Sequence, residues 1–139
     1  MTCLWLSNSW AESKWKIEFD WSTHKRLAHG SDNFPVTWAD DDNQYTTWGD
    51  GWGFKPSGSK VGLGISKIIG DKDNYYGKDI AYFRGKSYGI LATGDSINVL
   101  VSPDYGTAEF GETTLYRTFN YGKSWVKSWG FSKSGWVIT

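Results

Sequence analysis

Short runs of β-forming residues recur along the chain and are separated by turn-forming residues. Many of these runs alternate apolar and polar positions, which is the pattern of a strand with one buried face. No window of helical length carries a continuous 3.6-residue stripe of apolar residues bounded by caps. We therefore expect an all-β protein, with strands in the runs VTWAD, QYTTWGD, VGLGISKII, SYGILATG, INVLVSPD, TLYRTFN and SWVKSWGF.

Two clusters of polar turn residues lie between these runs. In the first cluster, Asp41, Asp42 and Asn43 separate VTWAD from QYTTWGD, and in the second, TGDS at 93–96 separates GILA from INVLV. Asp, Asn and Gly tolerate a left-handed backbone, and Asp and Asn side chains bond the main chain of tight turns. We therefore interpret the acidic cluster first as a hairpin turn.

The two hairpins predict an internal repeat. Aligning Asp42 with Gly94 gives an offset of 52 residues (94 − 42), and the same offset aligns Leu63 with Leu115 (115 − 63). A strand-rich unit of roughly 50 residues fits one four-stranded blade of a β-propeller. We expect blades at about 34–85 and 86–139, preceded by an N-terminal segment at 1–33.

Composition and charge indicate the number of domains and exclude some classes of partner. The chain has 139 residues and a mass of 15.7 kDa, which corresponds to one domain. Lys plus Arg and Asp plus Glu both number 15, so no net field attracts nucleic acid or an anionic membrane, and neither partner is expected. The 10 Trp and 17 Gly favour strands and tight turns.

The single cysteine and the N-terminal sequence indicate in which cellular compartment the protein is expected. Cys3 is the single cysteine, which excludes an internal disulfide framework. The first residues lack both a basic start and an unbroken apolar run of signal-peptide length, and about 18 apolar residues occur together nowhere in the chain. As written, the sequence predicts a soluble, cytoplasmic protein, although the compartment itself stays unknown.

The segment TFNYGKSW at 118–125 matches the pattern known as an Asp-box in sialidase-like propellers. In this pattern Asn120 is expected to bond the turn backbone, Gly122 to take a positive φ, and Trp125 to fill the space between strands. In that family the box lies at the outer turn between the third and fourth strands of a blade. It has a structural role there and does not bind substrate.

The chain as a whole resembles bacterial propeller proteins of the sialidase-like or five-bladed glycosidase-like kind. The similar segments are DWSTHKRLAHGSDNFPVTWADDDNQYTTWGDGWGF, VGLGISKI, GKSYGIL, VSPDYG and LYRTFNYGKSW. The resemblance covers about residue 19 to the C-terminus, and residues 38–54 are its most specific part. It implies a partial β-propeller of about two to three four-stranded antiparallel blades. Such proteins are usually more than twice this length.

A partial propeller has exposed surfaces that need a partner. A ring closes with at least four blades, and fewer blades leave sheet faces and strand edges exposed. Symmetric association of identical chains is the usual way to cover such surfaces. We therefore expect a homodimer, in which a second copy of the chain completes the propeller.

Acidic residues are the candidates for catalysis. Glycoside hydrolysis requires a carboxylic acid facing a carboxylate at about 5–10 Å. In the glycosidase-like propellers such acids project into a central pocket, so the resemblance nominates Asp40 or Asp41 as base or nucleophile and Glu112 or Glu109 as acid. A simpler interpretation is available for each, because Asp suits a hairpin turn and most loop carboxylates are merely solvated.

Aromatic and charged side chains are candidates for sugar binding. Sugar rings stack on exposed aromatic planes, which nominates Trp38 and Trp52, whereas large aromatic residues such as Trp48 and Trp125 are expected to serve packing. Further candidate contacts to substrate are Asp50, Arg26 and Arg117. The two arginines could clamp a carboxylated sugar. Sialidases use three arginines, and nothing in this sequence places its three together, so a complete sialidase site is not expected.

Metal binding receives little support from the sequence. His24 and His29 lack a third ligand at a suitable spacing, and DDDNQ lacks the spaced acids of a calcium loop. We predict no metal site and no cofactor, and leave calcium at a propeller loop open. The sequence thus favours a carbohydrate-binding or structural propeller module. The alternatives are a glycoside hydrolase whose pocket is completed by a second copy, and a stable domain without a small-molecule ligand.

Overall fold

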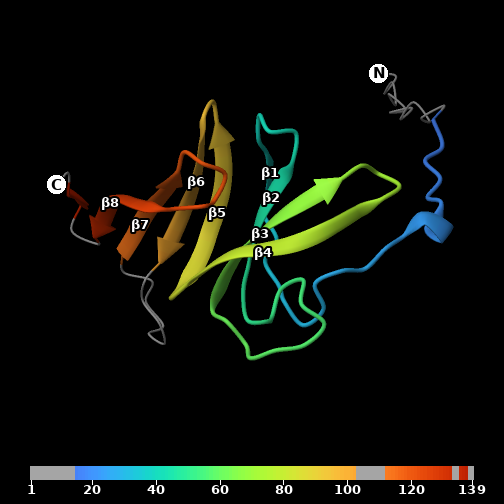
Figure 1. The fold of residues 1–139 in the computed structure, drawn as a ribbon, viewed down its shortest axis with the longest axis horizontal. Helices are drawn as coiled ribbons and strands as arrows, with labels where there is room; N and C mark the ends of the chain where they lie inside the picture. The colour runs from blue at the N-terminus through green and yellow to red at the C-terminus, as the bar shows by residue number, and fades with distance from the viewer. Residues whose placement is uncertain (1–14, 103–111, 133–134, 138–139) are drawn as a thin grey trace, which may run out of the picture.

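The computed structural model describes residues 15–102, 112–132 and 135–137. Within these ranges the chain forms nine strands in two antiparallel sheets, together with one turn of 3-10 helix at Trp21–Thr23 (Figure 1). The prediction of an all-β protein is confirmed. No helix in the described ranges has the length and apolar character needed to cross a lipid bilayer.

The first sheet, sheet 1, contains four strands in the order β1-β2-β3-β4. Its strands are β1 (Val36–Trp38), β2 (Gln44–Trp48), β3 (Leu63–Gly70) and β4 (Tyr75–Phe83). The second sheet, sheet 2, has the order β5-β6-β7-β8-β9. Its strands are β5 (Lys86–Thr93), β6 (Ser96–Ser102), β7 (Glu112–Thr118), β8 (Val126–Ser132) and β9 (Gly135–Val137). Only Arg84 and Gly85 connect the two sheets.

Both predicted hairpin turns are present. Asp42 lies in the turn between β1 and β2 with φ +58°, and Gly94 lies in the turn between β5 and β6 with φ +55°. The first turn is closed by backbone hydrogen bonds from Ala39 N–H to the Asn43 carbonyl and from Asp42 N–H to the Ala39 carbonyl, of 3.0 and 3.2 Å. Each turn therefore has a residue that tolerates a left-handed backbone at the position that requires this conformation.

A hydrophobic core joins the two sheets. It is built from the buried side chains of Ala39, Tyr45, Leu63 and Ile65 from sheet 1 and its hairpin, and of Ile90, Ile97, Val99 and Val101 from sheet 2. Burial of each large apolar side chain stabilises the fold by roughly 1.5–3 kcal/mol. Phe83 extends the core, with ring centroids 4.7 Å from Tyr116 and 5.8 Å from Trp125. The predicted packing role of Trp125 is confirmed.

The two sheets contact each other through β1 and β2 of sheet 1 and β5 of sheet 2. The backbone N–H of Ala92 on β5 donates to Thr37 Oγ1 on β1 at 2.9 Å, and Thr47 Oγ1 on β2 donates to Ser87 Oγ on β5 at 2.8 Å. In Figure 1 these strands occupy the middle of the molecule, with β3 and β4 extending to one side and β7 and β8 to the other.

The face of sheet 1 that points away from sheet 2 is partly covered by the loop 49–62. Trp48 lies on this face and is fully buried, with Nε1 donating to Ser66 Oγ at 2.7 Å. Ser66 Oγ donates in turn to Asp79 Oδ1 at 2.7 Å, and the same oxygen accepts the Phe54 N–H of the loop at 3.1 Å. The predicted packing role of Trp48 is confirmed, although Trp48 packs beneath its own loop and not between the sheets.

The turn between β7 and β8 has the local geometry that its motif predicts. Asn120 Oδ1 accepts hydrogen bonds from Ser124 N–H and Thr118 Oγ1, both at 2.9 Å. Gly122 has φ +85°, and its N–H donates to Thr118 Oγ1 at 3.0 Å. This turn connects the third and fourth strands of sheet 2.

The register of the two sheets departs from a uniform 52-residue repeat. Thr46 pairs with Ser66 in sheet 1, so a constant offset would pair Asn98 (46 + 52) with Thr118 (66 + 52). In sheet 2, Asn98 pairs with Arg117 instead. A slip of one residue moves a side chain to the other face of a strand. The expectation of one constant offset is therefore wrong between the second and third strands of each sheet.

Candidate functional site

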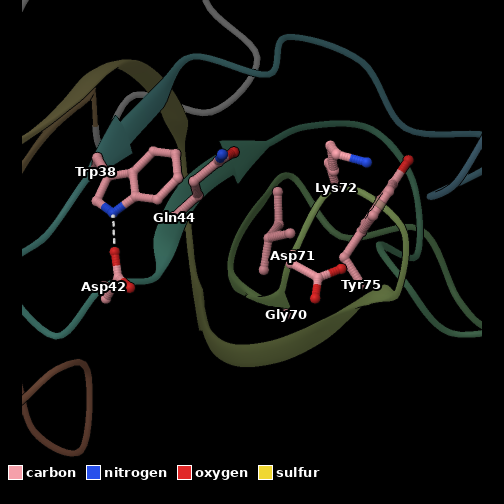
Figure 2. Close-up of a pocket in the computed structure, with 8 residues that line it drawn as sticks. Trp38, Asp42, Gln44, Gly70, Asp71, Lys72 and Tyr75 are labelled. Atoms are coloured by element: carbon pink, nitrogen blue, oxygen red, sulfur yellow. Dashed lines mark hydrogen bonds between the residues drawn. The ribbon is translucent and has the colours of Figure 1, made fainter.

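A cleft opens at one end of sheet 1, between the turn that joins β1 to β2 and the turn that joins β3 to β4. Its volume is about 400 Å³. Figure 2 shows Trp38 and Tyr75 at opposite sides of the cleft, with polar side chains between them. The residues that line it are Trp38, Asp42, Gln44, Ile68, Gly70, Asp71, Lys72 and Tyr75.

Strand register explains why residues distant in sequence meet here. Trp38 pairs with Gln44 across β1 and β2, and Gln44 pairs with Ile68 across β2 and β3. Two positions further along β3, Gly70 pairs with Tyr75. Residues directly opposite one another, and residues two apart on one strand, share a face of the sheet. The cleft therefore crosses all four strands.

Trp38 forms an exposed aromatic plane that is held in place. Its side chain is 61% exposed, and its Nε1 donates to Asp42 Oδ1 at 3.1 Å (Figure 2). Asp42 occupies the left-handed turn position, which brings its carboxylate beside the indole. A hydrogen bond to the ring nitrogen restricts the rotation of the indole and leaves its faces available for contact with a ligand.

Gln44 presents its side-chain amide to the cleft. Gln44 is half-buried, and its side chain makes no hydrogen bond with any of the described residues. A primary amide has two N–H donors and one carbonyl acceptor. Because Gln44 stands between Trp38 and Tyr75, its amide is available to a molecule lying in the cleft.

The turn between β3 and β4 contributes a second carboxylate and a lysine. Asp71 Oδ1 accepts the backbone N–H groups of Asn74 at 2.8 Å and Asp73 at 2.9 Å, and these two hydrogen bonds lower the pKa of Asp71. Lys72 Nζ pairs with Asp73 Oδ2 at 2.7 Å, on the solvent side of the cleft. Asp71 is therefore a carboxylate at neutral pH, with its second oxygen unused by the described residues.

Tyr75 is supported from the N-terminal segment. Lys25 Nζ lies 5.0 Å from the centroid of the Tyr75 ring and donates to the Asp73 carbonyl at 2.8 Å. Cation–π contacts of this kind stabilise by about 0.5–1 kcal/mol at exposed sites. Arg26 follows Lys25 in the sequence and is exposed. Arg26, a predicted substrate-binding residue, is not among the residues that line the cleft.

Asp40 and Asp41 lie in the first hairpin turn, where both accept structural hydrogen bonds. Asp41 Oδ2 accepts from Lys67 Nζ at 2.6 Å and from Tyr45 OH at 2.8 Å. Burial alone would raise the pKa of Asp41, but the hydrogen bonds from Lys67 and Tyr45 outweigh it and lower the pKa. Asp40 Oδ1 accepts from Tyr121 OH at 3.0 Å. Asp41 therefore fastens the hairpin to β2 and β3 of its own sheet, and Asp40 fastens it to the turn between β7 and β8.

Of the two predicted acids, Glu112 lies at the end of β7 that is far from these aspartates. Glu112 is the first residue of β7, whereas Tyr121, the partner of Asp40, lies beyond the last residue of that strand. A strand of seven residues spans roughly 20 Å, which exceeds the separation of a glycosidase carboxyl pair. Glu109 lies outside the described residues.

Trp52 and Asp50 lie away from the cleft. Trp52 is half-buried, and its ring lies so close to Gly30 that a Cβ there would come within 2.7 Å of it, so it is not the exposed plane that its glycine neighbours suggest. Asp50 forms an ion pair with Lys86 beside a second cavity of about 300 Å³. Trp38 alone of the predicted binding residues lines the larger cleft.

Arg117 lies on the open face of sheet 2. Its Nε donates to Asn98 Oδ1 at 2.6 Å, and its guanidinium carbon lies 5.7 Å from the centroid of the Phe119 ring. Asn98 and Arg117 alternate with core residues such as Val99, so they point away from sheet 1. Arg117 and Trp38 therefore occupy opposite sides of the molecule, and they do not form one site.

No group of three or more His, Cys, Asp and Glu side chains converges on a metal position within the described parts of the chain.

Gln44, Asp71, Lys72 and Tyr75 are residues of the cleft that the sequence patterns do not nominate. The signal for Gln44 is its place opposite Trp38 across a short hairpin, which follows once the turn is assigned. Tyr75 and Asp71 could be found only from the pairing of β3 with β4, because that pairing brings the second turn to the same face.

Comparison with known proteins adds no family assignment. Neither the models of protein families nor the curated protein sequences give a match to this chain.

Proposed function

We propose that the chain is a carbohydrate-binding module and that the cleft between Trp38 and Tyr75 holds the sugar. One observation carries the proposal: a Trp ring fixed by a hydrogen bond to Asp42 overhangs a cleft of about 400 Å³. Ligand sites are concave and combine apolar or aromatic surface with a few well-placed polar groups.

The groups in the cleft match the two surfaces of a sugar. A pyranose ring has C–H groups that stack on an aromatic plane, for which the 61% exposed indole of Trp38 is suited. Sugar hydroxyls both donate and accept hydrogen bonds. The amide of Gln44 offers both functions, and the second carboxylate oxygens of Asp42 and Asp71 accept.

We infer binding in preference to hydrolysis from the positions of the carboxylates. The predicted base or nucleophile, Asp41, already accepts hydrogen bonds from Lys67 and Tyr45, and Asp40 accepts one from Tyr121. Using either residue for catalysis would require breaking contacts that hold the hairpin. The hydrolase alternative would need a second copy to supply the missing acid.

We further propose that sheets 1 and 2 are consecutive blades of a partial propeller. The hydrogen bond between Thr37 and Ala92 brings the first strands together, and only two residues separate the sheets in sequence. A second copy would dock on the open face of sheet 2, where Leu91 and Val126 are exposed, because the loop 49–62 already covers part of the opposite face of sheet 1. The sialidase-like resemblance favours the same arrangement.

The test is a glycan array followed by titration of the glycans that bind. Trp38→Ala should weaken binding at least tenfold, since the stacking plane is removed. Trp21→Ala is the matched control, because Trp21 is also an exposed indole but lies in the N-terminal segment, outside the cleft. Binding that survives Trp38→Ala, or absence of binding to every glycan on the array, would overturn the proposal.

A further inference from the structure

The charge balance of the cleft indicates which sugars it prefers. Three charged side chains line it: Asp42, Asp71 and Lys72. Lys72 is paired with both carboxylate oxygens of Asp73, at 2.8 and 2.7 Å. Neither lining carboxylate forms an ion pair of this kind, since Asp42 bonds the neutral indole of Trp38 and Asp71 bonds backbone N–H groups, with Lys25 acting on Asp71 only from a distance while it bonds the Asp73 carbonyl.

Each lining carboxylate keeps an oxygen for a ligand. Asp42 uses Oδ1 for the Trp38 indole, and Asp71 uses Oδ1 for the Asp73 and Asn74 amides. The Oδ2 atoms of both residues make no hydrogen bond with any of the described residues. The cleft thus offers more acceptors than donors, because Gln44 is its one uncommitted amide. A ligand that carries several hydrogen-bond donors therefore suits the cleft.

An ammonium group is the donor that such surroundings favour most. It carries three N–H donors and no acceptor, and its hydrogen bonds to carboxylates are about twice as strong as neutral ones. An aromatic face also attracts a cation, and the exposed Trp38 indole stands beside the Asp42 carboxylate. A carboxylated sugar would meet like charges at the same oxygens and would be repelled.

Resting on the proposed carbohydrate function, we propose that the cleft selects saccharides bearing a free amino group, such as unsubstituted glucosamine units, over N-acetylated and acidic ones. One amine bonds Asp42 Oδ2 beside the Trp38 indole, an amine further along the saccharide bonds Asp71 Oδ2, and the ring hydroxyls bond Gln44 between them. In such a complex the two aspartates determine specificity, and Trp38 contributes affinity to every sugar.

The test is calorimetric titration of the full chain with three oligosaccharides of matched length: glucosamine, N-acetylglucosamine and galacturonic acid oligomers. The glucosamine oligomer should bind about tenfold more tightly than the N-acetylated one, and the acidic oligomer should not bind. Asp71→Asn and Asp42→Asn should each reduce the preference severalfold, because Asn keeps the Oδ1 acceptor and removes the charge. Asp95→Asn is the control, since Asp95 is an exposed acid in the other hairpin turn.

The outcomes separate the inference from the proposed function. Equal binding of the glucosamine and N-acetylglucosamine oligomers, lost in Trp38→Ala, would overturn the amine preference and leave the carbohydrate function standing. Binding of spermidine as tight as that of the glucosamine oligomer would also overturn the inference, in favour of a general cation site. No binding of any oligosaccharide would overturn both proposals.

Discussion

Lys67 on β3 and Asp41 in the first hairpin turn form an ion pair, with 2.6 Å between Nζ and Oδ2 and side-chain exposures of only 22% and 15%. The same lysine lies 5.5 Å from the ring centroid of Tyr45 and 5.8 Å from that of Tyr121. It therefore lies where the first hairpin turn of sheet 1 meets the turn between β7 and β8 of sheet 2.

Replacing Lys67 with Met should lower the free energy of unfolding by roughly 1–3 kcal/mol, because a shielded carboxylate would lose its compensating charge. Urea denaturation measures the change. Lys72→Met is the control, since its pair with Asp73 is exposed and should contribute nothing measurable. Equal losses in the two variants would contradict a special role for Lys67.

The pH dependence of stability should reflect Asp41. Its pKa is lower in the folded chain than the ordinary value of about 3.9, so its ionised form stabilises the fold above that pH. This contribution is lost as the pH falls through the lower folded pKa. We expect the wild-type free energy of unfolding to decrease more steeply than that of Asp41→Asn as the pH falls below about 4. Parallel curves from acid titration at constant urea would argue against this origin.

Gly77 should be intolerant of a side chain. A Cβ built at this position on β4 would collide with the ring of Phe54, which lies on it from the loop 49–62. Gly77→Ala should therefore cost about 1–3 kcal/mol and loosen the loop, as seen by thermal unfolding and hydrogen exchange at Phe54. Gly89→Ala on β5 is the matched control, because nothing lies within 4 Å of its added Cβ.

The expected homodimer can be tested by the mass in solution. Two chains of 15.7 kDa should sediment together if a second copy covers the open face of sheet 2. Leu91, 59% exposed on that face, is the residue to change, and Leu91→Lys should shift the mass to that of one chain. A single chain at all concentrations in the wild type would exclude the dimer.

Alternation and turn chemistry predict most of the fold. The runs VGLGISKII and INVLVSPD cover β3 and β6 except for Gly70 and Ser96, because apolar residues at every second position fill the core between the sheets. The left-handed turn residues Asp42 and Gly94 mark both hairpins. These are local properties, so one sequence suffices to find them.

Alternation of apolar and polar residues does not predict the strand β4. Its nine residues, YYGKDIAYF, include a glycine, a lysine and an aspartate, and no regular alternation separates an apolar from a polar face. Pairing with β3 and the hydrogen bonds at Asp79 hold it in the sheet. Such stabilisation comes from tertiary contacts, which override weak local propensity.

Local sequence patterns likewise predict only part of the candidate site. Trp38 could be nominated because it is an aromatic residue beside a polar turn. Its partners in the cleft depend on which turns meet at one end of sheet 1, and this follows from the strand order and register. For Asp41 the sequence favours turn formation over catalysis, but the hydrogen bonds from Lys67 and Tyr45 follow only from the fold.

The loop 49–62 lies across the outer face of sheet 1, with Phe54 seated over Gly77. In a pair of copies joined through sheet 2, both of these capped faces would point outward, so stacking would stop at two chains and could not propagate into fibres. Each outward face carries one cleft. Because the two faces point in opposite directions, one pair would link two separate glycan-bearing surfaces, each held by a single cleft.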